Sequence, residues 1–150
     1  MANRAHPNLL FIYCDELAWA TMACYGNSAI AMPNLNRLAA ASTVFERAYV
    51  TQPVCTPSRA ALLTGRHGQR TGVTGHVSPK SRNGLPKTET TIAAMLKAQG
   101  YSTIMVGKWH LGHHEKFLPM QHGFDDYFGL PYSNDMWPYH PGVLHLSMEE

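Results

Sequence analysis

The chain has 150 residues, is 45% hydrophobic and 15% charged, and carries a formal net charge of +2. This composition is that of a globular chain of single-domain size, and so small a charge without a lysine or arginine block argues against a nucleic-acid-binding surface. Three cysteines without metal-type spacing argue against a disulfide framework.

The N-terminus, MANRAHP, contains no long apolar stretch. The first apolar run, from Leu9 to Cys14, is too short to cross a membrane or to act as a signal peptide. We therefore expect no membrane partner and, by default, a cytoplasmic location.

The first predicted element is a strand in NLLFIYCDE, residues 8–16. A continuous apolar run is typical of a strand that is buried on both faces of a parallel sheet. Asp15 and Glu16 follow this run, at the carboxyl end of the strand, where open α/β sheets bind their ligands.

The next segments predict a helix, a short strand and a rigid loop. MPNLNRLAAAS, residues 32–42, predicts a helix with its proline in the first turn. TVFERAYV, residues 43–50, predicts a short strand. Pro53 and Pro57 define a loop, and Pro57 then begins a helix that ends at Gly65.

The second half of the chain repeats the alternation of helix and strand. Residues 67–88 are rich in Gly, Ser, Thr and Pro and predict a long loop. TTIAAMLKAQG, residues 90–100, predicts a capped helix, and YSTIMVG, residues 101–107, predicts a second buried strand. Residues after Gly112 read as irregular and aromatic. This order predicts an α/β fold with a largely parallel sheet flanked by helices.

Basic side chains are expected at the carboxyl edge of this sheet. Since residues i and i+2 of an extended chain share a side, Lys108 and His110 would face a cleft while Trp109 turns into the core. Arg59, in the helix that Pro57 begins, would join them and form a receptor for a tetrahedral oxyanion. The alternative is that Lys108 and His110 are solvated loop charges.

Two other residues, Asp15 and Cys55, carry candidate chemistry. Asp15 could hold a hard cation such as Ca²⁺ or Mg²⁺, or could be a turn or helix cap. Cys55 could be a thiolate nucleophile that the helix start and Arg59 activate. A cation and basic side chains around one anion would suit ester hydrolysis.

Several stretches resemble the type I sulfatases, of the alkaline-phosphatase-like superfamily. CTPSRAALLTGR, residues 55–66, matches their C-x-P-S-R-A-x-L-x-T-G-R signature, and GKWHLG, residues 107–112, matches their second signature. NLLFIYCDE resembles their first strand with its metal carboxylates, and residues 117–135 resemble the stretch that follows the second signature in arylsulfatases. The resemblance covers roughly residues 8–138 and implies the N-terminal part of a sulfatase catalytic domain.

In that family the signature cysteine is oxidised to formylglycine, which the resemblance implies for Cys55. Pro57 and Arg59 match what the formylglycine-generating enzyme reads, so this enzyme or an equivalent is an implied partner. The substrate is implied to be a sulfate ester. One hydroxyl of the hydrated aldehyde would attack sulfur, and the other would then collapse to the aldehyde and expel sulfate.

The resemblance also implies the roles of the other site residues. Arg59 would hold the formylglycine, and Lys108 and His110 would bind sulfate oxygens and the formylglycine. Ser133, in PYSND, matches a serine that contacts the sulfate region in arylsulfatases.

A metal, Ca²⁺ with Mg²⁺ or Mn²⁺ as alternatives, is implied at Asp15, Glu16 and the modified Cys55. Many members have Asp-Asp where this chain has Asp15-Glu16, and the family's remaining metal ligands come from later sequence. We therefore expect the 150-residue piece alone to be inactive or nearly so.

Two alternative functions stay open. A phosphonate monoester or phosphodiester hydrolase of the same superfamily would use the same nucleophile, and Glu16 favours it slightly. A truncated, non-catalytic remnant would bind anions at most.

Overall fold

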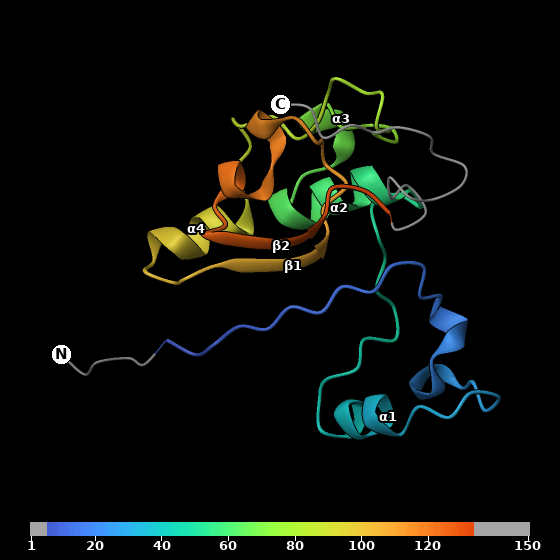
Figure 1. Ribbon diagram of the computed structural model, residues 1–150. Helices are drawn as coiled ribbons and strands as arrows, with labels where there is room; N and C mark the ends of the chain where they lie inside the picture. The colour runs from blue at the N-terminus through green and yellow to red at the C-terminus, as the bar shows by residue number, and fades with distance from the viewer. Residues whose placement is uncertain (1–5, 134–150) are drawn as a thin grey trace. The chain divides into compact units, whose positions relative to one another are not determined.

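The computed structural model describes residues 6–133, which form two compact units, one reaching to Tyr49 and the other starting at Val50 (Figure 1). Among residues 6–133, no helix is both long enough and apolar enough to span a membrane. The three cysteines, all in this range, are free thiols in the structure.

The first unit contains the predicted helix, α1 (Pro33–Ala40), and two short 3-10 turns, η1 (Trp19–Thr21) and η2 (Ala23–Tyr25). Pro33 lies in the first turn of α1, as expected from its fixed φ. The Tyr25 ring stacks on the Trp19 ring with centroids 5.1 Å apart, and its hydroxyl donates to the Phe45 carbonyl over 2.8 Å.

The two strands predicted in this half of the sequence are wrong for the described structure. Residues 8–16 and 43–50 form no strand, and the side chains of Leu10 and Ile12 are 86% and 71% exposed. A strand exists only with a hydrogen-bonded neighbour, and neither segment has one in the described part of the chain. The apolar composition of these segments was therefore not sufficient to predict a strand.

The second unit carries most of the regular structure. Its elements in chain order are α2 (Cys55–Thr64), α3 (Gly68–Thr71), α4 (Ile92–Ala98), β1 (Ile104–Lys108), η3 (Glu115–Phe117), η4 (Pro119–His122) and β2 (Asp126–Leu130). A parallel sheet with flanking helices confirms the α/β prediction.

The ends of the helices follow local chemistry. The Thr91 hydroxyl accepts a hydrogen bond from the Ala94 amide over 3.1 Å and so caps α4, as predicted. Gly65 ends α2 with a left-handed φ of 66°. The start of α2 differs from the prediction, because the first helical residue is Cys55 rather than Pro57.

The sheet pairs β1 with β2 in parallel, with Ile104 opposite Asp126 and Gly107 opposite Gly129. The prediction missed β2, since DYFGL begins with a carboxylate and contains a glycine. The glycine is required, because a Cβ at Gly129 would lie 1.9 Å from the Gly107 carbonyl oxygen.

Among the described residues of this unit, one face of the sheet is packed. Met105 and Tyr127 face the core, whereas Ile104, Val106 and Phe128 are 63%, 69% and 77% exposed. Figure 1 shows α2 and α3 on the same side of the sheet. The prediction that β1 is buried on both faces is therefore wrong for this unit, whose helices cover one face.

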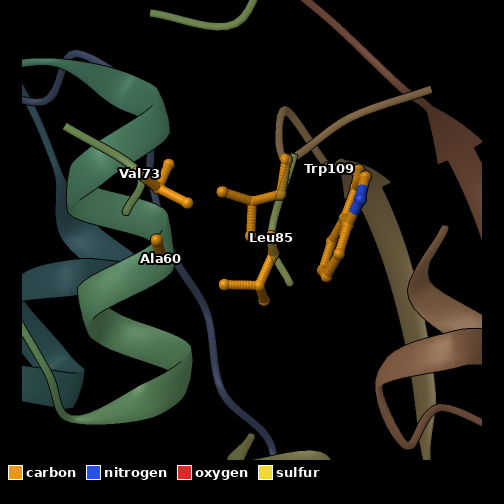
Figure 2. Close-up of a cluster of buried hydrophobic side chains, with 5 residues drawn as sticks. Ala60, Val73, Leu85 and Trp109 are labelled. Carbon is orange, nitrogen blue, oxygen red and sulfur yellow. The ribbon is translucent and has the colours of Figure 1, made fainter. Parts of the chain in front are cut away.

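The core of the second unit joins the segments that carry the candidate site. Its buried cluster consists of Ala60, Val73, Leu85, Trp109 and Leu111. Figure 2 shows Ala60 on a helix, with Leu85 between it and Trp109. This packing holds α2 against the residues that follow β1.

Candidate active site

Cys55 is the first residue of α2 and is half-buried. The residue before it, Val54, is extended, and its carbonyl accepts the first helical hydrogen bond, from the Ser58 amide over 3.1 Å. The position of Cys55 therefore places its side chain near the positive end of the α2 dipole, where negative charge is stabilised.

Arg59 lies one turn after Cys55 on α2, so the two residues share a face of the helix. Its side chain is only 8% exposed, and Nη1 donates to the Lys108 carbonyl oxygen over 2.6 Å. The buried guanidinium thus fixes the end of β1 to the helix that begins at Cys55 and leaves a positive charge beside both.

Lys108 is the last residue of β1, and the side chains of Trp109 and His110, which follow it, are oriented by different contacts. Trp109 is fully buried, which confirms that it turns into the core, and its indole donates to the Phe117 carbonyl over 2.8 Å. His110 has a left-handed φ of 60°, and its amide donates to the Pro131 carbonyl over 2.9 Å. A special backbone conformation, rather than strand alternation, therefore sets the direction of the His110 ring.

The His110 ring is 1% exposed and has a defined tautomer. Its Nε2 lies 3.0 Å from the Val77 carbonyl oxygen. Because a carbonyl oxygen can only accept, the neutral ring carries its proton on Nε2. Nδ1 is buried and has no hydrogen-bond partner among residues 6–133, so its lone pair is the ring's remaining polar group.

Positive groups surround this ring. Burial and then the Lys108 ammonium lower the pKa of His110 to about 4, and the His76 ring and Arg59 act in the same direction against the Val77 carbonyl. The ring centroids of His76 and His110 are 4.7 Å apart, edge to face. The structure therefore brings Arg59, Lys108 and His110 together, as a receptor for an anion requires.

Sequence reasoning missed how this cluster is tied to the start of α2. The Val77 amide donates to the hydroxyl of Thr56, the fully buried residue after Cys55, over 3.2 Å. Val77 thus connects the neighbour of Cys55, on one side, with the His110 ring on the other. Thr56 next to Cys55, and His76 within a loop rich in Gly, Ser and Thr, were the available signals.

The remaining predicted site residues are Asp15, Glu16 and Ser133. Asp15 and Glu16 are exposed and belong to the first unit, so their meeting with Cys55 stays a prediction. Glu16 has a left-handed φ of 55°. Ser133 is half-buried, and its contact with a sulfate group likewise stays a prediction.

The donor chemistry of Asp15 and Glu16 suits a hard cation, because carboxylate oxygens are the ligands that Ca²⁺ prefers. In residues 6–133, however, no group of three or more His, Cys, Asp or Glu side chains is arranged to hold a metal ion. The described residues alone therefore do not form a complete metal site.

Comparisons with known proteins identify the family of the chain. The profile of the family described as Sulfatase matches residues 7–145. Arylsulfatase A of Bos taurus is 47% identical over 141 residues, which cover 92% of this chain and 28% of the relative. N-acetylgalactosamine-6-sulfatase of Sus scrofa is 43% identical over 133 residues, which cover 83% of this chain and 26% of the relative.

Solved structures show the same likeness. One, from work on the metabolism of multiple glycosaminoglycans by Bacteroides thetaiotaomicron, is 36% identical with a TM-score of 0.81, covering 88% of this chain and 30% of the other. A sulfatase from Pseudoalteromonas sp., PsFucS1, is 36% identical with a TM-score of 0.53, covering 59% of this chain and 18% of the other. The chain spans less than a third of the length of these relatives.

Proposed function

Because the chain belongs to the sulfatase family, we propose that it takes part in hydrolysing a sulfate monoester through a formylglycine made from Cys55. The observation that carries the proposal is the convergence of Arg59, Lys108 and His110 beside the helix that Cys55 begins. The formylglycine-generating enzyme, or an equivalent, is the partner that this reaction needs.

Binding of the sulfate group falls to the basic side chains. Arg59 Nη1 donates to the Lys108 carbonyl, and this hydrogen bond holds the positive charge of Arg59 next to the end of β1. The Lys108 ammonium supplies a second positive charge close to His110. Fixed positive groups of this kind stabilise the charge that develops on sulfate oxygens during transfer.

His110 is placed to handle a proton at Nδ1. Its Nε2–H is held by the Val77 carbonyl, so Nδ1 can accept a proton from a hydroxyl in the site. A sulfate anion entering beside the ring would offset the Lys108 charge and raise the pKa of His110, which helps the ring to hold that proton. The hydrated formylglycine would supply the hydroxyls of this exchange.

A divalent metal ion is also part of the proposal, and two carboxylates are its candidate ligands. Asp15, with Glu16 beside it, would contribute carboxylate oxygens to a Ca²⁺, Mg²⁺ or Mn²⁺ ion, whose charge would assist the anion site.

The test is a paired assay on the protein purified from its native host, with an aryl sulfate and a phenylphosphonate ester. We expect the sulfate to be hydrolysed faster, and kcat/KM to fall about 100-fold or more in Lys108→Ala. Lys116→Ala is the matched control, since Lys116 is an exposed lysine whose ammonium lies over the Phe117 ring.

The phosphonate ester separates the proposal from its rival. Faster hydrolysis of the phosphonate ester would identify a phosphonate or phosphodiester hydrolase, which the Glu16 position favours slightly. Equal activity of Lys108→Ala and Lys116→Ala would show that the convergence of charges has no catalytic role.

A further inference from the structure

The Val77–Ser78 backbone is held by two aromatic rings from other segments. The Val77 carbonyl lies 3.0 Å from Nε2 of His110, and the Ser78 carbonyl accepts from the Tyr132 hydroxyl over 3.0 Å. The Tyr132 ring is 5% exposed and meets the His110 ring nearly edge on, with centroids 5.6 Å apart. Tyr132 therefore touches both the catalytic ring and the backbone that sets its tautomer.

His113 extends this contact. Its Nδ1 is hydrogen-bonded to the Tyr132 hydroxyl oxygen. The hydroxyl has one proton, and it donates this proton in the hydrogen bond to the Ser78 carbonyl, because a carbonyl oxygen can only accept. Both contacts are therefore satisfied only when His113 carries its proton on Nδ1 and donates to Tyr132. The order of donation is His113 to Tyr132 to the Ser78 carbonyl.

We propose that Tyr132 and His113 are positioning residues for His110. By fixing Ser78, they fix the neighbouring Val77 carbonyl, which selects the Nε2–H tautomer and leaves Nδ1 of His110 as an acceptor. The Tyr132 ring also limits rotation of the imidazole. This inference rests on the proposed function for its effect on rate, but its structural effect on His110 is independent of it.

The first experiment compares Tyr132→Phe with Tyr127→Phe in the native protein. The control loses a similar hydroxyl, which donates to the Gly107 carbonyl over 3.3 Å. We expect kcat for the sulfate ester to fall about tenfold in Tyr132→Phe with KM nearly unchanged, because misplacement of a catalytic group costs rate rather than binding. Tyr127→Phe should change kcat by less than about twofold. Equal losses in the two variants would overturn the proposal.

A second pair tests His113 and does not require Tyr132→Phe to fold. His113→Asn places an amide N–H donor near the position of Nδ1, whereas His113→Leu removes the donor. We expect the asparagine variant to retain most of kcat and the leucine variant to lose about as much as Tyr132→Phe. Similar values for both His113 variants would contradict the proposed donation.

Nitrogen-15 NMR of the His110 ring separates failure of this inference from failure of the proposed function. We expect the Nε2–H tautomer in the native protein and in Tyr127→Phe, and a mixture of tautomers in Tyr132→Phe. If sulfatase turnover is absent but the tautomer shifts, the positioning stands and the proposed function fails. An unchanged tautomer in Tyr132→Phe overturns the positioning, whatever the activity.

Discussion

Single residues decide how the cluster is held together, and Thr56 is the clearest case. Its hydroxyl is the acceptor for the buried Val77 amide, and the side chain has no exposed surface. Valine has nearly the same shape as threonine, but it offers no acceptor. Thr56→Val therefore removes the link between the neighbour of Cys55 and the carbonyl that holds His110.

We expect Thr56→Val to lower the free energy of unfolding by about 1–3 kcal/mol, the cost of a buried amide left without an acceptor. Urea denaturation of the variant and the native protein measures this difference. Arg37→Gln is the control, since Arg37 is exposed and its guanidinium donates to the side chain of Asn34 on the same helix. A change below about 0.5 kcal/mol, the usual range for surface substitutions, would show that the Val77 amide has found another acceptor.

His122 predicts a pH dependence of stability. Its ring is 2% exposed, neither ring nitrogen has a hydrogen-bond partner among residues 6–133, and burial followed by Lys87 lowers its pKa to about 4. The unfolded chain, with a pKa near the ordinary value of 6.5, therefore binds the additional proton between about pH 6.5 and 4. The contribution of His122 to stability is fully present above pH 6.5 and is lost as the pH falls through this range.

Denaturation at pH 7, 6 and 5 tests this dependence. Between pH 7 and pH 5 the native protein should lose about 2 kcal/mol of stability from His122, because the loss is about 1.36 kcal/mol for each pH unit below 6.5. His122→Leu should show a weaker dependence, because leucine does not titrate, and the exposed His67→Leu should keep the native one. Parallel curves for the native protein and His122→Leu would contradict the account.

Some residues of the site are marked by short sequence motifs, whereas others are brought in only by contacts between distant positions. Cys55, Arg59, Lys108 and His110 stand in short motifs, so the sequence pointed to all four. The contacts of Val77 with Thr56 and His110 join positions 21 and 33 residues apart. No pattern in a single sequence marks such pairs, because they arise only when the core has folded.

At the level of the elements, local patterns predicted α1, α4 and β1. They missed α3, which lies within the predicted loop of residues 67–88, and β2. A proline in the first turn marked α1, and a threonine cap and a glycine stop marked α4, all of which are local signals. Strands depend on neighbours that are distant in the sequence. Residues 8–16 therefore looked like a strand without pairing, whereas β2 pairs without looking like one.

The pairing of Gly107 with Gly129 predicts a severe effect of a single methyl group. A Cβ at position 129 would lie 1.9 Å from the Gly107 carbonyl oxygen, so Gly129→Ala should separate β1 from β2. We expect a loss of at least about 3 kcal/mol in the free energy of unfolding, measured by thermal or urea denaturation.

Gly75→Ala is the matched control for this substitution. A Cβ at Gly75 meets no atom within 4 Å, so we expect a change of less than about 0.5 kcal/mol there. Equal stability of the two variants would mean that the strands tolerate the methyl group by shifting apart.

At the level of the whole molecule, the chain matches the sulfatase family over residues 7–145 but spans less than a third of its relatives. Residues 6–133 contain Cys55 and the basic cluster of Arg59, Lys108 and His110. It does not supply a group of three or more ligands for a metal within residues 6–133.

We therefore predict that the purified 150-residue chain hydrolyses an aryl sulfate no faster than the buffer does, even with Ca²⁺ present. Weak Ca²⁺ binding is the physical reason, because this ion needs six or more oxygen ligands. Turnover above the buffer rate that disappears in Cys55→Ala would contradict this prediction.

The central claim is that Cys55 becomes the nucleophile, and mass spectrometry of its tryptic peptide, AYVTQPVCTPSR (residues 48–59), from the native host tests it most directly. Conversion of the thiol group to the aldehyde lowers the peptide mass by about 18 Da, and we predict that this lighter peptide dominates. A peptide that keeps its free thiol, in a host that modifies other such proteins, would contradict the formylglycine mechanism.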